Sequence, residues 1–414
     1  MICLKSKYFK IATGFSIIIA IALFAATINV MSMPGNIKIS GSKSEQINFK
    51  NNSLKNNFIY KVESNNNEKG LTNKNNSLNI SIKLFGIIPV KKMTLSFVPE
   101  FKVIPGGQPI GVKINIDGIL VVGFADVETG KGWKQSPALA AGINIGDRIV
   151  EINGTKVDNC NELSNMINSN KDSILKIKLS NNDGFRTVEV KPLETKNKDE
   201  YKIGLWVRDS TAGIGTLTFY YDKTNIFGAL GHPISDVDTG IIIPINSGKI
   251  YTAKIMAIEQ GVRGKPGELK GTFSIEDEIG SIEKNTPSGI YGKFTGKVDK
   301  PLYSKPIPIA MQNEIKEGPA KILTSINGNE VKEYDIYIEK LTQQTKPNSK
   351  SMIIRITDNE LLSKTGGIVQ GMSGSPIIQD GKLVGAITHV FVNKPDMGYG
   401  IYIEWMLKEA GIDF

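Results

Sequence analysis

The sequence predicts a mainly β protein that starts with a membrane-spanning helix. Glycine supplies 42 of the 414 residues, about 10% against a typical ~7%, and this excess favours strands joined by tight turns over a helical bundle. Short apolar runs with glycine and proline between them recur from residue 80 onwards, as strands do. The length allows two to three domains at about 150 residues each. Hydrophobic residues make up 40% of the chain, so a wholly disordered or fibrous protein is excluded.

The composition also limits the chemistry. With only two histidines, His232 and His389, and two cysteines, Cys3 and Cys160, the chain has no disulfide framework and no histidine- or cysteine-based metal site. We expect neither a metal nor a cofactor. The net charge of +9 could indicate nucleic acid or an anionic membrane. Because the lysines are dispersed and no basic helix is evident, we attribute the charge to general composition and expect no nucleic-acid partner, and binding of anionic lipid stays a weaker hypothesis.

The N-terminus has the pattern of an uncleaved membrane anchor. Residues 1–10 carry Lys5, Lys7 and Lys10 and are expected in the cytoplasm. Residues 11–28 hold no charge, and as a helix they would span about 27 Å, close to the hydrocarbon thickness. We therefore expect an anchor at residues 11–30 and export of the rest of the chain. A cleavable signal peptide is the alternative, although the apolar run is long for one.

The next segment, residues 31–79, is predicted to be a flexible tether. Residues 36–80 contain thirteen Asn, seven Lys and three Glu, with few apolar residues and no clear periodicity, as in solvated linkers. Such a segment is also where proteolysis concentrates. Residues 80–102 then alternate in polarity around Pro89, which predicts a short β segment of two strands.

Residues 103–193 form the second predicted domain. A short helix is expected after Ser136, with Pro137 in its first turn and Gly142 at its end. A second helix is expected at residues 163–167. The expected strands include residues 111–114, 120–124, 174–179 and 187–190, and residues 145–154 are expected to form a turn, a strand and an Asn-Gly turn.

This domain resembles a PDZ domain, most specifically over residues 137–154. PDZ domains bind an extended peptide as an added strand beside a helix. The resemblance implies a peptide-binding loop at Gly111 and Val112, with Val112 and Ile114 offering backbone amides to a chain terminus. Because the usual four-residue loop is incomplete here, an internal peptide or a membrane partner is an equal expectation.

Residues 201–414 form the third predicted domain, and their length fits one all-β double barrel. Their sharpest motif is Gly371-Met372-Ser373-Gly374-Ser375-Pro376, followed by a hairpin. Acyl transfer needs a hydroxyl on a tight turn, with backbone N–H groups beside it for the oxyanion. The motif resembles the nucleophile loop of chymotrypsin-like serine proteases, with Ser373 as nucleophile and the N–H groups of Gly371 and Ser373 as oxyanion hole.

A serine nucleophile needs a base, for which histidine is the usual residue. In the chymotrypsin-like order the histidine precedes the serine and comes from the other barrel, which selects His232. We expect His389 to be structural or to line the substrate cleft. Spacing leaves the carboxylate that would orient the imidazole open, and the candidates are Asp236, Asp238, Asp299, Asp335 and Asp358.

Three longer runs carry a closer resemblance: residues 207–219, residues 227–240, and residues 365–370 leading into the serine motif. They are similar to the stage IV sporulation protein B family, the PDZ-containing serine peptidases of spore-forming Firmicutes. The order of anchor, PDZ domain and peptidase domain also matches. The resemblance implies a triad of Ser373, His232 and Asp358, with Asp236 in reserve for the acid.

The resemblance further implies a signalling protease of endospore formation. Such a protein sits at the inner forespore membrane, faces the space between the forespore and mother-cell membranes, and cleaves itself near its N-terminus. It then cuts a membrane-bound regulatory complex, which activates the protease that matures the mother-cell sigma factor. Its own PDZ domain and tether are expected partners, in cis or in trans. The alternative is a catalytically inactive PDZ scaffold that binds membrane partners.

Overall fold

The computed structural model describes residues 35–40, 60–64, 77–84, 87–171, 173–181, 183–198, 200–296 and 301–414. The chain divides into two compact units, one reaching Phe101 and including Phe414, the other running from Lys102 to Asp413. The predicted cytoplasmic segment and anchor, residues 1–30, lie outside the described residues. Within the described ranges, no helix combines the length and apolarity that a membrane span requires.

The first unit contains a four-stranded sheet with the order β1-β4-β3-β2. Its strands are β1 (Asn36–Ser40), β2 (Tyr60–Ser64), β3 (Ser77–Leu84) and β4 (Ile88–Val98). The last two match the short β segment predicted from residue 80. The described parts of the tether region, however, are strands and not irregular chain. The sequence signal was the alternation of Ile37 and Ile39 with polar residues in β1, which is too short to stand out in an Asn-rich segment.

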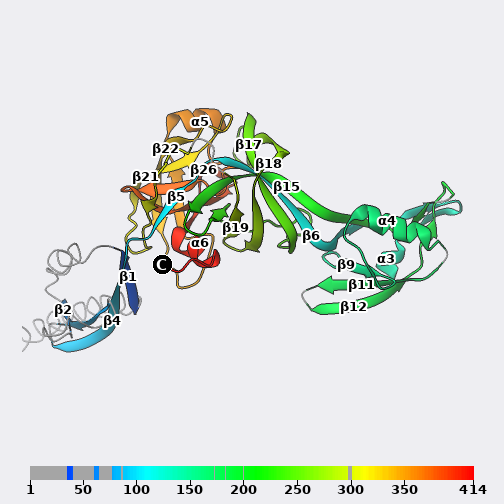
Figure 1. The fold of residues 1–414 in the computed structure, drawn as a ribbon, viewed down its shortest axis with the longest axis horizontal. Coiled ribbons are helices and arrows are strands. Elements are labelled where there is room, and N and C mark those ends of the chain that lie inside the picture. The colour runs from blue at the N-terminus through cyan, green and yellow to red at the C-terminus, as the bar shows by residue number, and fades with distance from the viewer. Residues whose placement is uncertain are drawn as a thin grey trace, which may run out of the picture. The chain divides into compact units, whose positions relative to one another are not determined.

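The second unit is mainly β and holds two closed rings of strands (Figure 1). In the first ring, β6 pairs with both β17 and β15, which closes a circuit of six strands. The members are β6 (Pro109–Phe124), β17 (Ile245–Glu259), β18 (Glu268–Thr286), β19 (Gly289–Phe294), β16 (Ile226–Ala229) and β15 (Leu205–Tyr221). Two short strands, β5 (Lys102–Pro105) and β20 (Ile307–Pro308), extend the sheet beyond β15.

The second ring is a closed six-stranded barrel. Its strands in order are β21 (Gly318–Thr324), β22 (Lys332–Leu341), β23 (Met352–Ile356), β26 (Lys394–Tyr402), β25 (Lys382–Phe391) and β24 (Pro376–Gln379). Two helices accompany it, α5 (Asn359–Thr365) and α6 (Ile403–Glu409). The hairpin predicted after the serine motif is β24 and β25.

The predicted PDZ domain is built on one end of β6 and β15. Its sheet continues from β6 through β9 (Arg148–Ile152) to β11 (Leu175–Asn181) and β12 (Gly184–Val190), with β10 (Thr155–Lys156) beside β9. The short pairs are β7 (Val127–Thr129) with β8 (Gly132–Lys134), and β13 (Leu193–Glu194) with β14 (Tyr201–Lys202).

The two PDZ helices form where capping residues stand. Helix α3 (Pro137–Ala140) follows Ser136, whose side chain accepts a hydrogen bond from the Leu139 N–H at 3.1 Å, as predicted. Helix α4 (Cys160–Ser169) starts after Asn159, whose side chain accepts from the Glu162 N–H at 2.9 Å. Both are N-caps that satisfy otherwise unpaired N–H groups.

Strand β6 belongs to both the first ring and the PDZ domain, so the border between these two parts lies within the strand and not at residue 103 as predicted. Its first half pairs with β17 and β15 in the first ring, and only its last residues pair with β9. Residues 103–116 therefore belong to the peptidase ring and not to the PDZ domain that was expected to start at residue 103. A single continuous strand gives no break in the sequence, so the pattern could not reveal this division.

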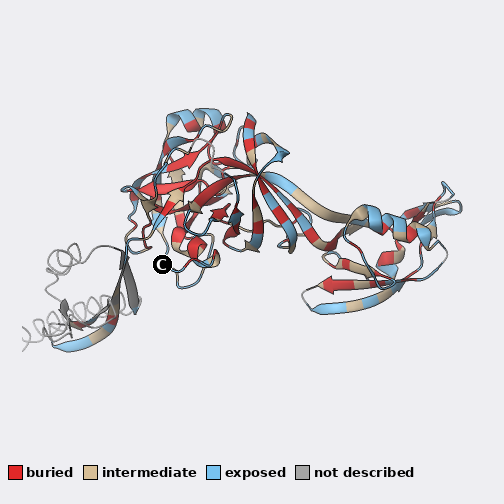
Figure 2. Cartoon of the chain, in the orientation of Figure 1, coloured by how far each residue is buried: buried red, intermediate tan, exposed pale blue. Residues whose placement is uncertain are grey.

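Each of the three parts of the second unit has its own apolar core (Figure 2). Ile149, Ile177 and Leu179 are fully buried in the PDZ domain. Ile110 and Phe227 are fully buried in the first ring. The barrel core centres on residues such as Ile322, Ile354 and Ile377.

We expect Ile354→Ala to lower the free energy of unfolding of the barrel by about 2–5 kcal/mol, because it leaves a cavity among close-packed side chains. The matched control is Ile275→Ala, at a side chain that is 69% exposed, which should change stability by less than about 0.5 kcal/mol. Urea unfolding followed by tryptophan fluorescence measures both. Equal losses in the two variants would contradict the assignment of the core.

Candidate active site

The serine motif forms a tight loop in front of β24. Gly371 and Gly374 have φ angles of +95° and +96°, which side-chain-bearing residues rarely adopt. A methyl group on Gly374 would also lie 2.1 Å from the carbonyl oxygen of Thr216. Both positions thus need glycine, for conformation and at Gly374 also for space.

The loop is fastened to strand β15 of the first ring. The Thr216 N–H donates to the carbonyl oxygen of Ser373 at 3.0 Å, and the Thr216 hydroxyl donates to that of Gly371 at 2.8 Å. The buried Thr218 hydroxyl donates to the Gly374 carbonyl, also at 2.8 Å. The serine of one barrel is therefore positioned by a strand of the other.

Two N–H groups of the loop are left for a ligand. The N–H groups of Gln370, Met372, Gly374 and Ser375 all donate to backbone carbonyls. Within the part of the chain that the structure describes, the N–H groups of Gly371 and Ser373 donate to no protein acceptor. These are the two groups predicted to form the oxyanion hole, and their availability is what that role requires.

The Ser373 hydroxyl donates to the carbonyl oxygen of Thr388 in β25 at 2.8 Å. The loop that carries His232 packs against both the serine loop and Thr388. A methyl group on Gly374 would be 2.5 Å from the Leu230 nitrogen, and one on Gly231 would be 2.9 Å from the Thr388 methyl group. The structure therefore brings together the two loops that the sequence separates by 141 residues.

The hydrogen bonding of His232 fixes its tautomer. Its Nδ1 lies 2.8 Å from the Pro233 carbonyl oxygen. Because a carbonyl only accepts, Nδ1 carries the proton and Nε2 is left as the proton acceptor. Burial lowers the pKa of His232 below its usual value, against a smaller opposing effect of the Pro233 carbonyl. The ring is thus neutral at pH 7 and competent as a general base.

His389 packs against this imidazole in a tilted arrangement, with ring centroids 5.0 Å apart and planes inclined by 40°. Burial is the main cause that lowers the pKa of His389 to about 4, with smaller electrostatic contributions from the neighbouring His232 and Lys350. His389 is therefore a neutral neighbour of the base.

The carboxylate that the family resemblance assigns to the triad has a different set of contacts. Asp358 is the N-cap of α5, and its Oδ1 accepts from the Leu361 N–H at 2.9 Å. Its Oδ2 accepts a long 3.4 Å bond from the Asp335 N–H. Among the described residues, no hydrogen bond joins Asp358 to His232. The sequence signal for a cap was the aspartate directly before a helix-forming run.

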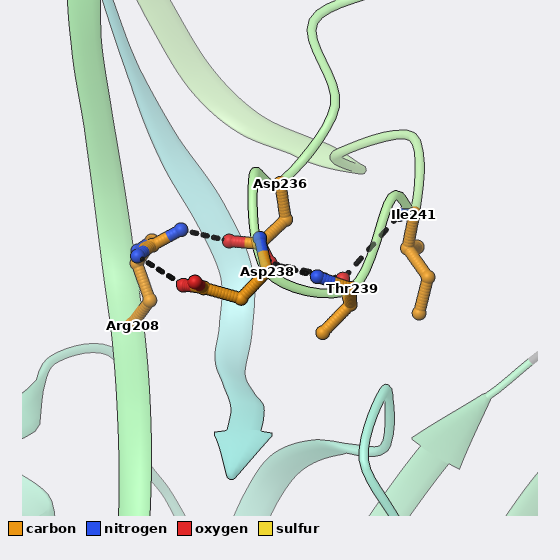
Figure 3. A network of polar contacts seen from close by, with 5 residues as sticks. All are labelled: Arg208, Asp236, Asp238, Thr239 and Ile241. Atoms are coloured by element: carbon orange, nitrogen blue, oxygen red, sulfur yellow. Dashed lines mark hydrogen bonds and ion pairs between the residues drawn. The ribbon is translucent and has the colours of Figure 1, made fainter.

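The reserve carboxylate, Asp236, is also engaged elsewhere (Figure 3). Its Oδ1 accepts from the N–H and the hydroxyl of Thr239 and from the Asp238 N–H, and its Oδ2 pairs with Arg208. Burial opposes ionisation, but these hydrogen bonds and the Arg208 charge outweigh it and lower the pKa of Asp236. Asp238 pairs with the same guanidinium at 2.8 Å. Of the two remaining candidates, Asp335 is exposed in β22, and Asp299 lies outside the described residues.

The residues predicted to bind a peptide terminus are not at a surface. Gly111, Val112 and Ile114 lie in β6 between β15 and β17 and are buried, and a methyl group on Gly111 would overlap the Phe273 ring. The prediction of a peptide-binding loop there is wrong, because these residues are a central strand of the first ring.

A groove lies instead between α4 and the start of β15, with a volume of about 320 Å³. From α4 it is lined by Cys160, Leu163 and Ile167, and from the facing chain by residues 201–207. Burial and the adjacent Asp209 raise the pKa of the Cys160 thiol to about 12, so this thiol is not a nucleophile. Across the described ranges, no group of three or more His, Cys, Asp or Glu side chains could hold a metal ion.

Comparisons with known proteins agree with this architecture. Residues 199–407, about half of the chain, match the SpoIVB peptidase S55 family. The chain belongs to the SpoIVB peptidase S55 family. Residues 133–180 match the PDZ domain family. This S55 peptidase is thus a serine endopeptidase that carries a PDZ domain.

Solved structures with similarity to this S55 peptidase include a domain and two proteases. The PDZ domain of an SdrC-like protein from Listeria monocytogenes is 24% identical over 22% of this chain and 87% of that chain, with a TM-score of 0.18. The active form of the Rv3671c protease from M. tuberculosis is 14% identical over 49% and 76%, with a TM-score of 0.30. The HtrA-type protease AlgW with a decapeptide is 12% identical over 51% and 53%, with a TM-score of 0.28. No curated protein matches the chain.

The contacts of Asp358 predict that Asp358→Asn keeps proteolysis within a few-fold of wild type, because asparagine caps a helix as well as aspartate does. Asp358→Ala should instead lower the free energy of unfolding by about 1 kcal/mol. Thermal unfolding and kcat/KM are measured on both variants. A loss approaching ~10⁴ in kcat for a normally stable Asp358→Asn would establish Asp358 as the triad acid after all.

The environment of His232 predicts the pH profile. Protonated His232 cannot accept the serine proton, so activity falls as pH drops through its pKa. Because burial lowers that pKa, the midpoint of the acid limb of kcat/KM should lie below pH 6.5, the ordinary value. A midpoint above 6.5 would instead indicate a carboxylate against the imidazole.

Proposed function

We propose that this S55 peptidase is a membrane-anchored, self-cleaving signalling protease of endospore formation. In this proposal it sits at the inner forespore membrane, with its barrels in the space facing the mother cell. Its substrate is a membrane-bound regulatory protein, whose cleavage activates the protease that matures the mother-cell sigma factor. The family membership and the long resemblance around residues 207–240 and 365–376 support this role. The observation that carries the catalytic part is the pair of free N–H groups beside Ser373.

The proposed reaction starts when the Ser373 hydroxyl exchanges its bond to Thr388 for one to Nε2 of His232. His232 takes the proton as Ser373 Oγ attacks the peptide carbonyl, and the N–H groups of Gly371 and Ser373 bind the oxyanion. His232 then gives the proton to the leaving amine, and a water molecule releases the acyl group by the same route. One such oxyanion donor is worth about 10²–10³ in kcat.

The tether is the proposed site of self-cleavage. It offers stretches of polar chain to an exported active site, in the same molecule or in a neighbouring copy. The PDZ groove beside α4 is proposed to hold a peptide segment of the substrate or of the tether as an added strand. The lysines of residues 1–10 and the uncharged run at residues 11–28 support a membrane anchor. The Asn-rich stretch that follows supports a spacer between the anchor and the peptidase.

Replacing the nucleophile tests the proposal. In the full chain, Ser373→Ala should abolish fragments cut within residues 31–79 and lower turnover on the order of 10⁶-fold, because the catalytic residues act as a unit. The matched control is Ser375→Ala in the same loop. The Ser375 hydroxyl is buried and, in the described part of the chain, has no hydrogen-bond partner, so its loss should leave cleavage intact.

The alternative of an inactive PDZ scaffold predicts a different result. Fragment patterns would then be identical in wild type, Ser373→Ala and Ser375→Ala, because any cleavage would come from another protease. Mass spectrometry of the purified chains, with the cleavage sites mapped, separates the two outcomes.

A further inference from the structure

The loop that follows His232 is held at two points. At its base, the Asn285 side chain of β18 donates to the carbonyl oxygens of Ile234 and Ile243 at 2.8 and 2.9 Å. At its tip, Asp236 closes a turn around Thr239, and its own N–H donates to the Ile241 carbonyl at 2.9 Å. These bonds preform the loop. They use Oδ1 of the buried Asp236 and leave Oδ2 to contact residues outside the loop.

Among the described residues, the Arg208 guanidinium is the one cation that pairs with this oxygen. Figure 3 shows Arg208 reaching from β15 to both Asp236 and Asp238. The Asp236 side chain has no exposed surface, whereas Arg208 is 29% exposed. The charge of this carboxylate is stabilised by three hydrogen bonds at Oδ1 and by Arg208 at Oδ2, so loss of Arg208 would leave Oδ2 without its ion pair. Arg208 thus ties the turn at Asp236 to β15, and on the other side of His232 the Leu230 N–H donates to the Thr216 carbonyl oxygen of the same strand at 3.3 Å.

The next residue of β15 makes the corresponding contact on the PDZ side. Asp209 accepts a hydrogen bond from the Cys160 N–H, the first residue of α4, at 2.8 Å. The pairing of β15 with β6 changes register between Arg208 and Ser210, and such a bulge re-aims a side chain. Arg208 and Asp209 therefore connect one strand to the His232 loop and to the helix that walls the groove.

Strand β15 also contacts the loop that carries Ser373. Residues 205–207 of β15 line the groove, Arg208 holds the base loop, and Thr216 and Thr218 hold the serine loop. A peptide that adds to the groove contacts the chain directly before Arg208.

We propose that Arg208 is a positioning residue that keeps His232 in its reactive place and transmits the state of the PDZ groove to it. This inference rests on the proposed serine-protease function. In this role Arg208 does not contact the substrate. Arg208 acts on His232 only through Asp236 and the loop that carries both residues.

The test uses the full chain and a fluorophosphonate reagent, which labels a serine only where a base activates it. Arg208→Gln should lower the maximal labelling rate of Ser373 at least tenfold and leave the half-saturating reagent concentration unchanged. Arg208→Lys keeps a charge for Asp236 and should recover part of that rate. The matched control is Arg186→Gln, which removes the partner of the equally buried Asp147 in the PDZ domain and should leave labelling unchanged.

Unfolding temperatures are measured alongside, and labelling is done well below them. If Arg208→Gln labels as fast as wild type, or if Arg186→Gln slows labelling equally, the positioning role is overturned. Wild-type protein that does not label at Ser373 overturns the proposed function as well, so the two failures are distinguishable.

The coupling to the groove is tested with Asp209→Ala, which removes the β15 acceptor of the Cys160 N–H at the start of α4 and leaves Arg208 in place. We expect this variant to slow labelling, and to add no further loss in the Arg208→Gln background, because both act through one connection. An Asp209→Ala variant with wild-type labelling, or with fully additive losses, would overturn the transmission from the groove.

Discussion

The active site depends on one strand, β15, that belongs to the first ring and yet holds parts of all three regions of the second unit. Its hydroxyl and N–H groups at Thr216 and Thr218 bind the backbone of the serine loop. Its Arg208 binds the turn that follows His232. Since strands are stiff relative to loops, the two loops that carry Ser373 and His232 gain their relative geometry from this shared support.

Close backbone approach is the second constraint. Gly374 lies against Thr216 and Leu230, and Gly231 lies against Thr388. Any side chain at these glycines would push the two loops apart and with them the serine and the imidazole. The motif therefore needs its glycines to let two barrels meet at van der Waals distance, as well as to shape the oxyanion loop.

The electrostatics of the site favour a neutral imidazole. Burial lowers the proton affinity of His232, and its neighbour His389 adds no negative charge. The orienting acceptor in this structure is the Pro233 carbonyl, a dipole and not a charge. Compared with a carboxylate, a carbonyl fixes the tautomer but stabilises the imidazolium less.

The sequence by itself determined the features that rest on local chemistry: the mainly β class, the capped helix at Ser136 and the hairpin that follows the serine motif. Its errors concern residues whose role depends on partners far along the chain. The prediction of a peptide-binding loop at Gly111 is wrong because nothing local in the sequence shows that β15 and β17 pair with β6 on both sides. The carboxylates could not be ranked, because Asp358 and Asp236 differ only in what they contact, a helix end in one case and Arg208 in the other. Strand pairing across more than a hundred residues decides those contacts, and the tertiary structure alone supplies it.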